Sequence, residues 1–130
     1  MIIGIGHDLA EVERFSALLQ GKQQSRFINR ILTGSERELV LTMQGERLAQ
    51  FVAGRFAAKE AVVKALGCGI GRIVGFADME IARGAAGGPS CLLSDSAWAR
   101  LELEPQATSI HVTITHERNM ASAFAVIERR

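Results

Sequence analysis

Three charged side chains have the types and spacing of a site that binds phosphate through a divalent cation. Glu60 and Lys64 stand four residues apart, so they project from one side of a helix. Asp8 supplies a second carboxylate from a distant part of the chain. Mg²⁺ prefers a few carboxylate oxygens together with water and substrate phosphates. This set suits the transfer of a phosphate-linked group, in which positioning and charge neutralisation do most of the work.

Each of these residues also has a purely structural interpretation. Glu60 and Lys64 form an i,i+4 pair, which on a solvated helix face contributes only about 0.2–0.5 kcal/mol. Asp8 followed by Glu11 fits a capping box at the start of a helix. Spacing alone leaves the structural and the functional interpretations open.

A long helix is predicted around Glu60 and Lys64, within residues 51–71. This stretch has good helix formers and no proline, and apolar side chains recur around it at helical spacing, at Leu48, Val52, Phe56, Val63 and Leu66. Gly67 is expected to end the helix. Beside the apolar stripe stand Ala49, Ala53 and Ala57, whose small side chains would let another backbone or a ligand come close.

The loop that follows the helix, residues 67–71, has almost no side chains. Its backbone N–H groups suit a phosphate or a thin chain, although a plain helix stop explains the same glycines. His116 stands at the end of an expected strand, where it either has a structural role or donates to a phosphate. His111 is expected to be structural, and His7 to point to the opposite side of its strand from Asp8.

Positive charge is one-sided near the N-terminus. Between Arg14 and Ser35 there is no acidic residue, and the basic residues are Arg14, Lys22, Arg26 and Arg30. The whole chain has 15 basic and 14 acidic residues, which gives no general reason to expect nucleic acid or a membrane surface as a partner. The local excess favours an acidic partner, and a solvated face is the alternative.

Length and composition place the chain among single globular domains, spanning residues 1–130. No apolar run approaches the roughly 18 residues of a membrane span, and the N-terminus lacks the basic leader of a signal peptide. Cys68 and Cys91 show no metal-binding spacing and are expected to be free thiols in a reducing cytoplasm. A catalytic Cys68 is a minor alternative.

The remaining segments predict an α+β fold, in which a mostly antiparallel sheet packs on one long helix and shorter helices. A buried strand is expected over residues 1–6, ending before Asp8, and a helix over 11–20. Ser35 and Glu38 fit a capping box that opens a helix reaching about Met43. A hairpin is expected over 76–83 and 90–93, then a helix capped by Ser94 or Asp95, then antiparallel strands over 110–115 and 120–127.

Several segments of the chain resemble holo-[acyl-carrier-protein] synthases, the small bacterial class of 4′-phosphopantetheinyl transferases. They are GIGHDLAEVER at 4–14, FINRILTGSE at 27–36, FAAKEAVVKALGCGIGR at 56–72 and HVTITHE at 111–117. The first contains the family pattern G-x-D-x-x-E/D-V-x-R, and the third contains F-x-x-K-E-A-x-x-K-A. The two patterns occur in the family's order and at its separation, and the resemblance covers essentially the whole chain.

The resemblance implies a reaction and a set of residues that perform it. The phosphopantetheine arm of coenzyme A would pass to a serine of apo-acyl carrier protein, a step of fatty acid biosynthesis, and adenosine 3′,5′-bisphosphate would be released. Asp8 and Glu60 would bind Mg²⁺ with the pyrophosphate of coenzyme A. Lys64 would contact that pyrophosphate and protonate the leaving group.

The resemblance also implies where the substrates bind. The positions that match residues near the nucleotide or the pantetheine arm are Arg55, Gly67, Ile70 and His116. The acidic carrier protein would dock at Arg14, Lys22, Arg26 and Arg30, in agreement with the one-sided charge. The family is typically a homotrimer with its active sites between subunits.

Some features stay open at this point. Glu117 follows His116 where relatives often carry Thr, Ser or Asp. The general base is a metal-bound water, Asp8, or a carboxylate such as Glu117. Two other functions are alternatives: a non-catalytic module that holds an acidic protein on the basic segment, and another coenzyme-A-using enzyme such as a thioester hydrolase.

Overall fold

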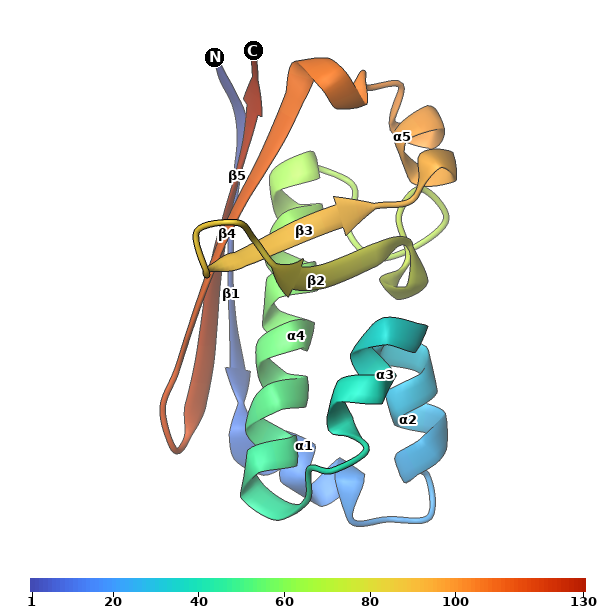
Figure 1. Cartoon of the computed structure of the whole chain (residues 1–130), viewed down its shortest axis with the longest axis vertical. Helices are drawn as coiled ribbons and strands as arrows, with labels where there is room; N and C mark the ends of the chain where they lie inside the picture. The colour runs from blue at the N-terminus through green and yellow to red at the C-terminus, as the bar shows by residue number, and fades with distance from the viewer.

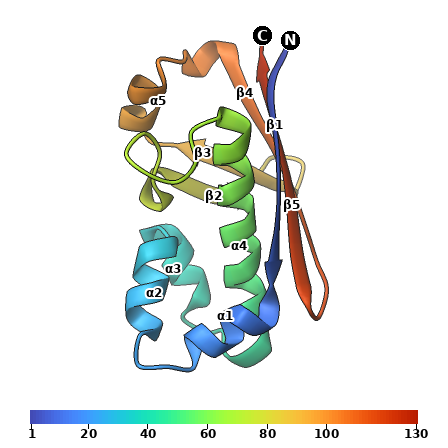
Figure 2. The same ribbon diagram turned by 180° about the vertical axis from the view of Figure 1, so that it is seen from behind.

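One long helix, α4 (Gly45–Leu66), runs through the middle of the computed structural model, which describes all residues from Met1 to Arg130. On one side it is covered by an antiparallel sheet in the order β1 (Ile2–Glu11), β5 (Met120–Arg129), β4 (Thr108–His116). The shorter helices and a two-stranded hairpin lie on the other side (Figure 1; Figure 2). The predicted α+β class, with mostly antiparallel strands on a long helix, is confirmed.

Helix α4 ends where its sequence predicts but begins earlier. Gly67 adopts a φ of 80° and caps the helix, which confirms the predicted stop. The Cys68 N–H then donates to the Val63 carbonyl at 3.1 Å. The helix starts at Gly45, six residues before the predicted stretch. No helix is both long enough and apolar enough to cross a membrane.

Strand β1 is longer than predicted and runs straight through Asp8. It pairs with β5 along its length, with Asp8 opposite Ala123 and Glu11 opposite Met120. The prediction that the strand ends before Asp8 was wrong, because the ladder with β5 continues to Glu11. Glu11 is the N-cap of α1 (Val12–Leu19) and makes no side-chain cap bond, so the predicted capping box with Asp8 is also wrong.

Two glycines let β1 lie directly on α4. A Cβ on Gly4 would stand 1.7 Å from the Ala65 carbonyl oxygen, and one on Gly6 would stand 1.9 Å from the Ala61 carbonyl oxygen. No side chain fits in that space, so the strand must carry glycine there. The opposite face of β1 is open, with Ile5 64% exposed, so the strand is covered on one face only and is not the fully buried strand predicted.

The shorter elements follow the predicted order with shifted ends. Thr33, not Ser35, caps α3 (Gly34–Val40), because its hydroxyl accepts from the Glu36 N–H and the Glu36 carboxylate accepts from the Thr33 N–H. Ser94 caps α5 (Asp95–Leu101) through the Ala97 N–H, as one of the two predicted caps. The other elements are α2 (Gln24–Ile31), η1 (Phe76–Asp78), β2 (Met79–Arg83), β3 (Pro89–Leu93) and η2 (Pro105–Ala107).

Residues 76–83 form a short 3₁₀ turn before the strand, and not one continuous strand as predicted. The Asp78 carboxylate accepts from the Gly75 N–H at 2.9 Å, which closes the turn η1 and delays the start of β2 to Met79. The hairpin of β2 and β3 and the β4–β5 hairpin are both confirmed.

Small side chains form the contact between α4 and the sheet. Helix α4 packs closely on β1 and β5, and the inward residues of β5 are buried: Ala121, Ala123, Ala125 and Ile127. On the helix, Ala49, Ala53 and Ala57 are also buried. Their side of the helix, expected to admit a backbone or a ligand, is therefore enclosed in the core.

A buried ion pair joins α4 to the short helices and to β2. The Lys59 side chain is 0% exposed, and its Nζ donates to Glu36 Oε1 at 2.6 Å and to the Ile31 carbonyl at 2.7 Å. Glu36 Oε2 accepts from the Ile81 N–H at 2.8 Å. This pair fixes the ends of α2 and α3 against α4, and it was not predicted from the sequence.

Candidate active site

Asp8 and Lys64 meet between β1 and α4. Lys64 Nζ donates to Asp8 Oδ1 and to the His7 carbonyl, each at 3.0 Å. Asp8 has the same strand parity as Gly4 and Gly6, so its side chain points toward α4. The close approach at those glycines therefore brings the carboxylate to the lysine, although the two residues are 56 positions apart.

Glu60 joins this pair as a second carboxylate. It is partly buried, and burial and the nearby Asp8 raise its pKa above the ordinary value, while Lys64 opposes the shift. Asp8 is thus close enough to disfavour the charged form of Glu60. The alternative i,i+4 pair of Glu60 with Lys64 is not formed, because the lysine bonds to Asp8 instead.

The chemistry of this cluster fits a divalent cation. Asp8 Oδ2 is buried and has no hydrogen-bond partner, which leaves one carboxylate oxygen for another ligand. No group of three His, Cys, Asp or Glu side chains gathers closely enough to cage a metal. A cation held by Asp8 and Glu60 would take its remaining ligands from water and phosphate, which is the mode of binding that Mg²⁺ prefers.

The loop after α4 begins next to the same cluster. Gly67 comes three residues after Lys64, and Gly67 and Gly69 have φ values of 80° and 65°. There is open space where a Cβ would stand at Gly67, Gly69 and Gly71. Ile70 is half-buried and is bridge-paired with Val74. The loop has room for a thin ligand beside Lys64.

Arg55 and His116 lie on the other flank of α4. Both line a pocket of about 220 Å³ together with Arg83 and the turn between β2 and β3. Arg55 and Lys64 are nine residues apart, and at about 100° per residue they point to opposite sides of the helix. β4, which carries His116, and β1, which carries Asp8, are opposite edges of the sheet. The predicted site residues therefore form two separate groups.

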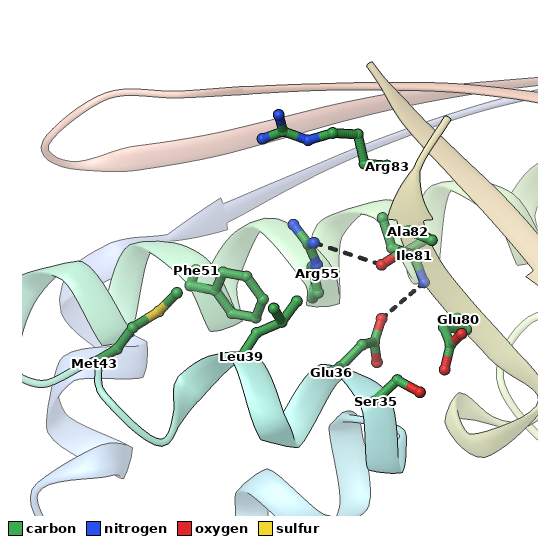
Figure 3. Close-up of a pocket in the computed structure, with 10 residues that line it drawn as sticks. All are labelled: Ser35, Glu36, Leu39, Met43, Phe51, Arg55, Glu80, Ile81, Ala82 and Arg83. Carbon is green, nitrogen blue, oxygen red and sulfur yellow. Dashed lines mark hydrogen bonds between the residues drawn. The ribbon is translucent and has the colours of Figure 1, made fainter. Parts of the chain in front are cut away.

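Arg55 also forms the wall of a neighbouring pocket of about 530 Å³ between α3, α4 and β2 (Figure 3). Its guanidinium lies 4.2 Å from the centre of the Phe51 ring and makes one long bond, 3.5 Å, to the Ile81 carbonyl. Its Nε is buried without a partner. Burial lowers the pKa of Arg55, opposed by the Glu36 charge. This desolvated cation has donors free for an anion.

The predicted basic patch lies on α1, α2 and their connection. Its residues, Arg14, Lys22, Arg26 and Arg30, are all exposed. None of them is among the ion pairs of the structure. The patch therefore presents four uncompensated positive charges to solvent, as its sequence predicts.

The remaining histidines and cysteines stay outside the cluster. His7 points to the outer face of the sheet and stacks on Phe124 with ring centres 4.1 Å apart, as predicted. His111 bonds to Glu128 at 2.9 Å on the same face. Burial raises the pKa of the Cys68 thiol, which disfavours the thiolate that a catalytic cysteine requires.

Comparisons with known proteins agree with this geometry. Residues 4–124 match the family model of the 4′-phosphopantetheinyl transferase superfamily. A holo-[acyl-carrier-protein] synthase of Bacillus cereus (strain B4264) is 41% identical over 128 residues, covering 98% of this chain and 97% of that protein.

Solved structures show the same likeness. The crystal structure of a holo-(acyl-carrier-protein) synthase from Bacillus anthracis str. Ames in complex with CoA (3′,5′-ADP) is 38% identical, with a TM-score of 0.83 over 100% of this chain and 99% of that one. The Neisseria meningitidis enzyme is 34% identical, with a TM-score of 0.84 over 99% and 100% of the two chains. The chain therefore belongs to the holo-[acyl-carrier-protein] synthases of the 4′-phosphopantetheinyl transferase superfamily.

Proposed function

We propose that this chain transfers the 4′-phosphopantetheine arm of coenzyme A to a serine of an apo-acyl carrier protein in a Mg²⁺-dependent reaction. The released product would be adenosine 3′,5′-bisphosphate, and the reaction would serve fatty acid biosynthesis in the cytoplasm. The observation that supports it most is the cluster of Asp8, Glu60 and Lys64 beside an open glycine loop. Similar chains are named for this activity, and one of them is described in complex with CoA.

In this reaction the serine oxygen forms a bond to the β-phosphorus of coenzyme A, and the bond from that phosphorus to the bridging oxygen breaks. The serine proton would pass to a general base such as Asp8 or Glu117. Asp8 and Glu60 would hold Mg²⁺, which when bound neutralises charge on the pyrophosphate. Lys64 stands on the same side, with its side chain half-exposed, and would contact the pyrophosphate and give a proton to the leaving bisphosphate. The loop at Gly67 and Ile70 would take the pantetheine arm.

Arg55 and His116 would bind the nucleotide end of coenzyme A, and we place them on a neighbouring subunit. Within one chain they lie on the opposite flank of α4 from Lys64. The outer face of the sheet offers a surface for such a neighbour, because Ile5, Leu9 and Phe124 are exposed there. We therefore propose a homotrimer in which each site combines the Asp8 group of one subunit with the Arg55 group of the next.

The basic patch of α1 and α2 would dock the carrier protein. Its four cations have no acidic neighbours in ion-pairing range, so an acidic partner would neutralise them. Docking there requires the carrier's serine to reach the Asp8 cluster. Strand β1 leads directly from Asp8 into α1, so the two surfaces are joined through one continuous segment.

Mass spectrometry of apo-acyl carrier protein tests the proposed transfer. Incubation with this chain, coenzyme A and Mg²⁺ should add the mass of one phosphopantetheine arm, and chelation of the metal should stop the reaction. Binding of the carrier without any gain of mass would support the alternative of a non-catalytic module. Release of a free thiol from an acyl-coenzyme A without modification of the carrier would support a thioester hydrolase.

Mixing two inactive variants tests the shared site. Lys64→Ala removes one group and Arg55→Ala removes the other. If the site spans two subunits, randomly mixed trimers pair two intact groups at one interface in four, so about a quarter of wild-type activity should return. A mixture of refolded variants that stays as inactive as its parts would place both groups in a site within one subunit, and an active single variant would remove its residue from the site.

A further inference from the structure

A network of five residues outside the site described above ties the loop after α4 to α5. Arg100, on α5, donates through Nε to the Ile73 carbonyl at 2.8 Å and through Nη2 to Asp78 Oδ2 at 2.9 Å. Asp78 Oδ2 also accepts from the Gly75 N–H at 2.9 Å, and Oδ1 accepts from the Ser94 hydroxyl at 2.7 Å. We name the Arg100–Asp78 pair with these bonds the latch.

The latch holds the far end of the loop, and α4 holds the near end. Gly67 and Cys68 are bonded to the last turn of the helix, while Ile73 and Gly75 are bonded to the latch. Between them, the Gly71 N–H donates to the Val74 carbonyl at 3.0 Å, and the Val74 side chain is 0% exposed. The Gly69 N–H also donates to the Val63 carbonyl, at 3.4 Å, so the segment that follows it, around Ile70, spans two fixed ends.

The bonds of the latch reach the loop backbone rather than the core. Arg100 is 41% exposed and Asp78 21% exposed. An ion pair of this exposure contributes little to global stability. One guanidinium nevertheless holds a loop carbonyl and a carboxylate that itself holds a loop N–H. The main effect of the latch is therefore to fix the position of the loop.

We propose that Arg100 and Asp78 are positioning residues for coenzyme A, which they do not touch. They hold the segment around Gly69 and Ile70 at the distance from Lys64 that the pantetheine arm requires. Loss of the latch lets the loop sample other positions, and coenzyme A then has to order it on binding. This inference rests on the proposed function, since it takes coenzyme A as the ligand beside the loop.

Steady-state kinetics of Arg100→Gln tests this role. Glutamine is too short to bond both Ile73 and Asp78, so the KM for coenzyme A should rise about fivefold to tenfold. The kcat and the KM for the carrier protein should stay within about twofold, because Lys64 and the basic patch are unchanged. Arg100→Lys keeps the charge and one bond, and it should recover part of the loss. Arg129→Gln, which removes an exposed arginine without a side-chain partner, should leave all three parameters unchanged.

Hydrogen exchange gives a readout that does not depend on turnover. In Arg100→Gln the amides of residues 69–75 should exchange faster, while those of α4 keep the wild-type rate. Binding of coenzyme A should slow the hydrogen exchange of the loop amides in the wild type. If Arg100→Gln does not fold, Asp78→Asn takes its place, because it removes the charge partner of Arg100 and keeps the length of the side chain. It should show the same rise of the KM for coenzyme A and the same faster exchange of the loop amides.

Four outcomes overturn the proposal. An unchanged KM for coenzyme A in a variant whose loop exchanges faster would show that loop position does not control binding. A fall of kcat with a rise of both KM values, together with faster hydrogen exchange throughout the chain, would show that the latch has a purely structural role. A wild-type chain that transfers no arm would overturn the proposed function as well, whereas an active wild type with an unaffected variant overturns only this inference.

Discussion

Lys64 Nζ lies 3.0 Å from Asp8 Oδ1 and bonds a strand residue to a helix residue 56 positions away. This contact sets the lysine against β1 and leaves Glu60, one turn earlier, without an ion pair. Burial and the Asp8 charge then raise the pKa of Glu60. At a partly buried pair of carboxylates with one lysine, a divalent cation would relieve the repulsion between the carboxylates and, together with the lysine, would attract a phosphate.

Glu60→Gln should abolish nearly all transfer while the chain stays folded. The amide keeps the size of the side chain but removes one of the two charges that would hold Mg²⁺, so we expect at least about a 100-fold loss of kcat. The measurement is arm transfer at saturating Mg²⁺, with circular dichroism as the check on folding. Glu46→Gln, an exposed acid in the first turn of the same helix, is the matched control and should transfer at the wild-type rate. Wild-type transfer by Glu60→Gln would remove Glu60 from the metal site.

Reversal of charge in the basic patch should weaken carrier binding selectively. With Arg14 and Arg26 both changed to glutamate, the KM for the carrier should rise about tenfold and depend less on salt, because attractive charges at the docking surface are lost. The KM for coenzyme A should stay constant. Arg129→Glu with Arg130→Glu changes the net charge equally at the C-terminal end of the chain, far from α1 and α2 (Figure 1), and controls for charge alone. An unaltered carrier KM in the first variant would place docking elsewhere.

Lys59→Met should destabilise the fold strongly, by about 3–5 kcal/mol, because it leaves the buried Glu36 carboxylate without its cation. The double variant with Glu36→Gln should recover part of this loss, since no unpaired charge then remains. Both values come from urea unfolding at one fixed protein concentration, because association of subunits changes the apparent stability. A Lys59→Met free energy of unfolding within about 1 kcal/mol of wild type would show that the pair is dispensable.

Asp78 should make the free energy of unfolding depend on pH in the acid range. Burial alone would raise its pKa, but the bonds from Gly75, Ser94 and Arg100 outweigh burial and hold the pKa below its ordinary value of 3.8. A carboxylate with a lowered pKa contributes stability that is complete above the ordinary value and is lost as pH falls through the folded value. The free energy of unfolding of Asp78→Asn should therefore fall less than that of wild type between about pH 5 and about pH 2. Equal slopes for the two proteins would contradict this role.

Locally encoded features of the fold could be predicted from the sequence. Gly67 ends α4 because only glycine readily adopts the left-handed conformation there, and alternation from Ile110 to Thr115 marks β4. The length of β1 could not be predicted in this way. Its ladder depends on β5, more than 100 residues away, and that pairing prevailed over the local cap signal of Asp8 and Glu11.

Part of the candidate site could likewise be predicted from the sequence, and part could not. Family-like motifs pointed to Asp8, Glu60 and Lys64, and the structure brings them together. Lys59 was missed, although it occupies the apolar stripe between Phe56 and Val63, where a buried charge needs a partner. That partner, Glu36, comes from a different helix. The separation of Arg55 from Lys64 could have been predicted, because nine residues along one helix place them on opposite sides. The separation of His116 from Asp8 follows only when strand order is known, because it depends on β5 lying between β1 and β4.

Anomalous diffraction from crystals grown with coenzyme A and Mn²⁺ tests the shared cation most directly. Mn²⁺ takes the same oxygen ligands as Mg²⁺ and scatters anomalously. We predict one peak per site, within coordination distance of an oxygen from Asp8, an oxygen from Glu60 and the pyrophosphate. Bound coenzyme A with no peak between these two carboxylates, or with the peak held by other residues, would contradict the account.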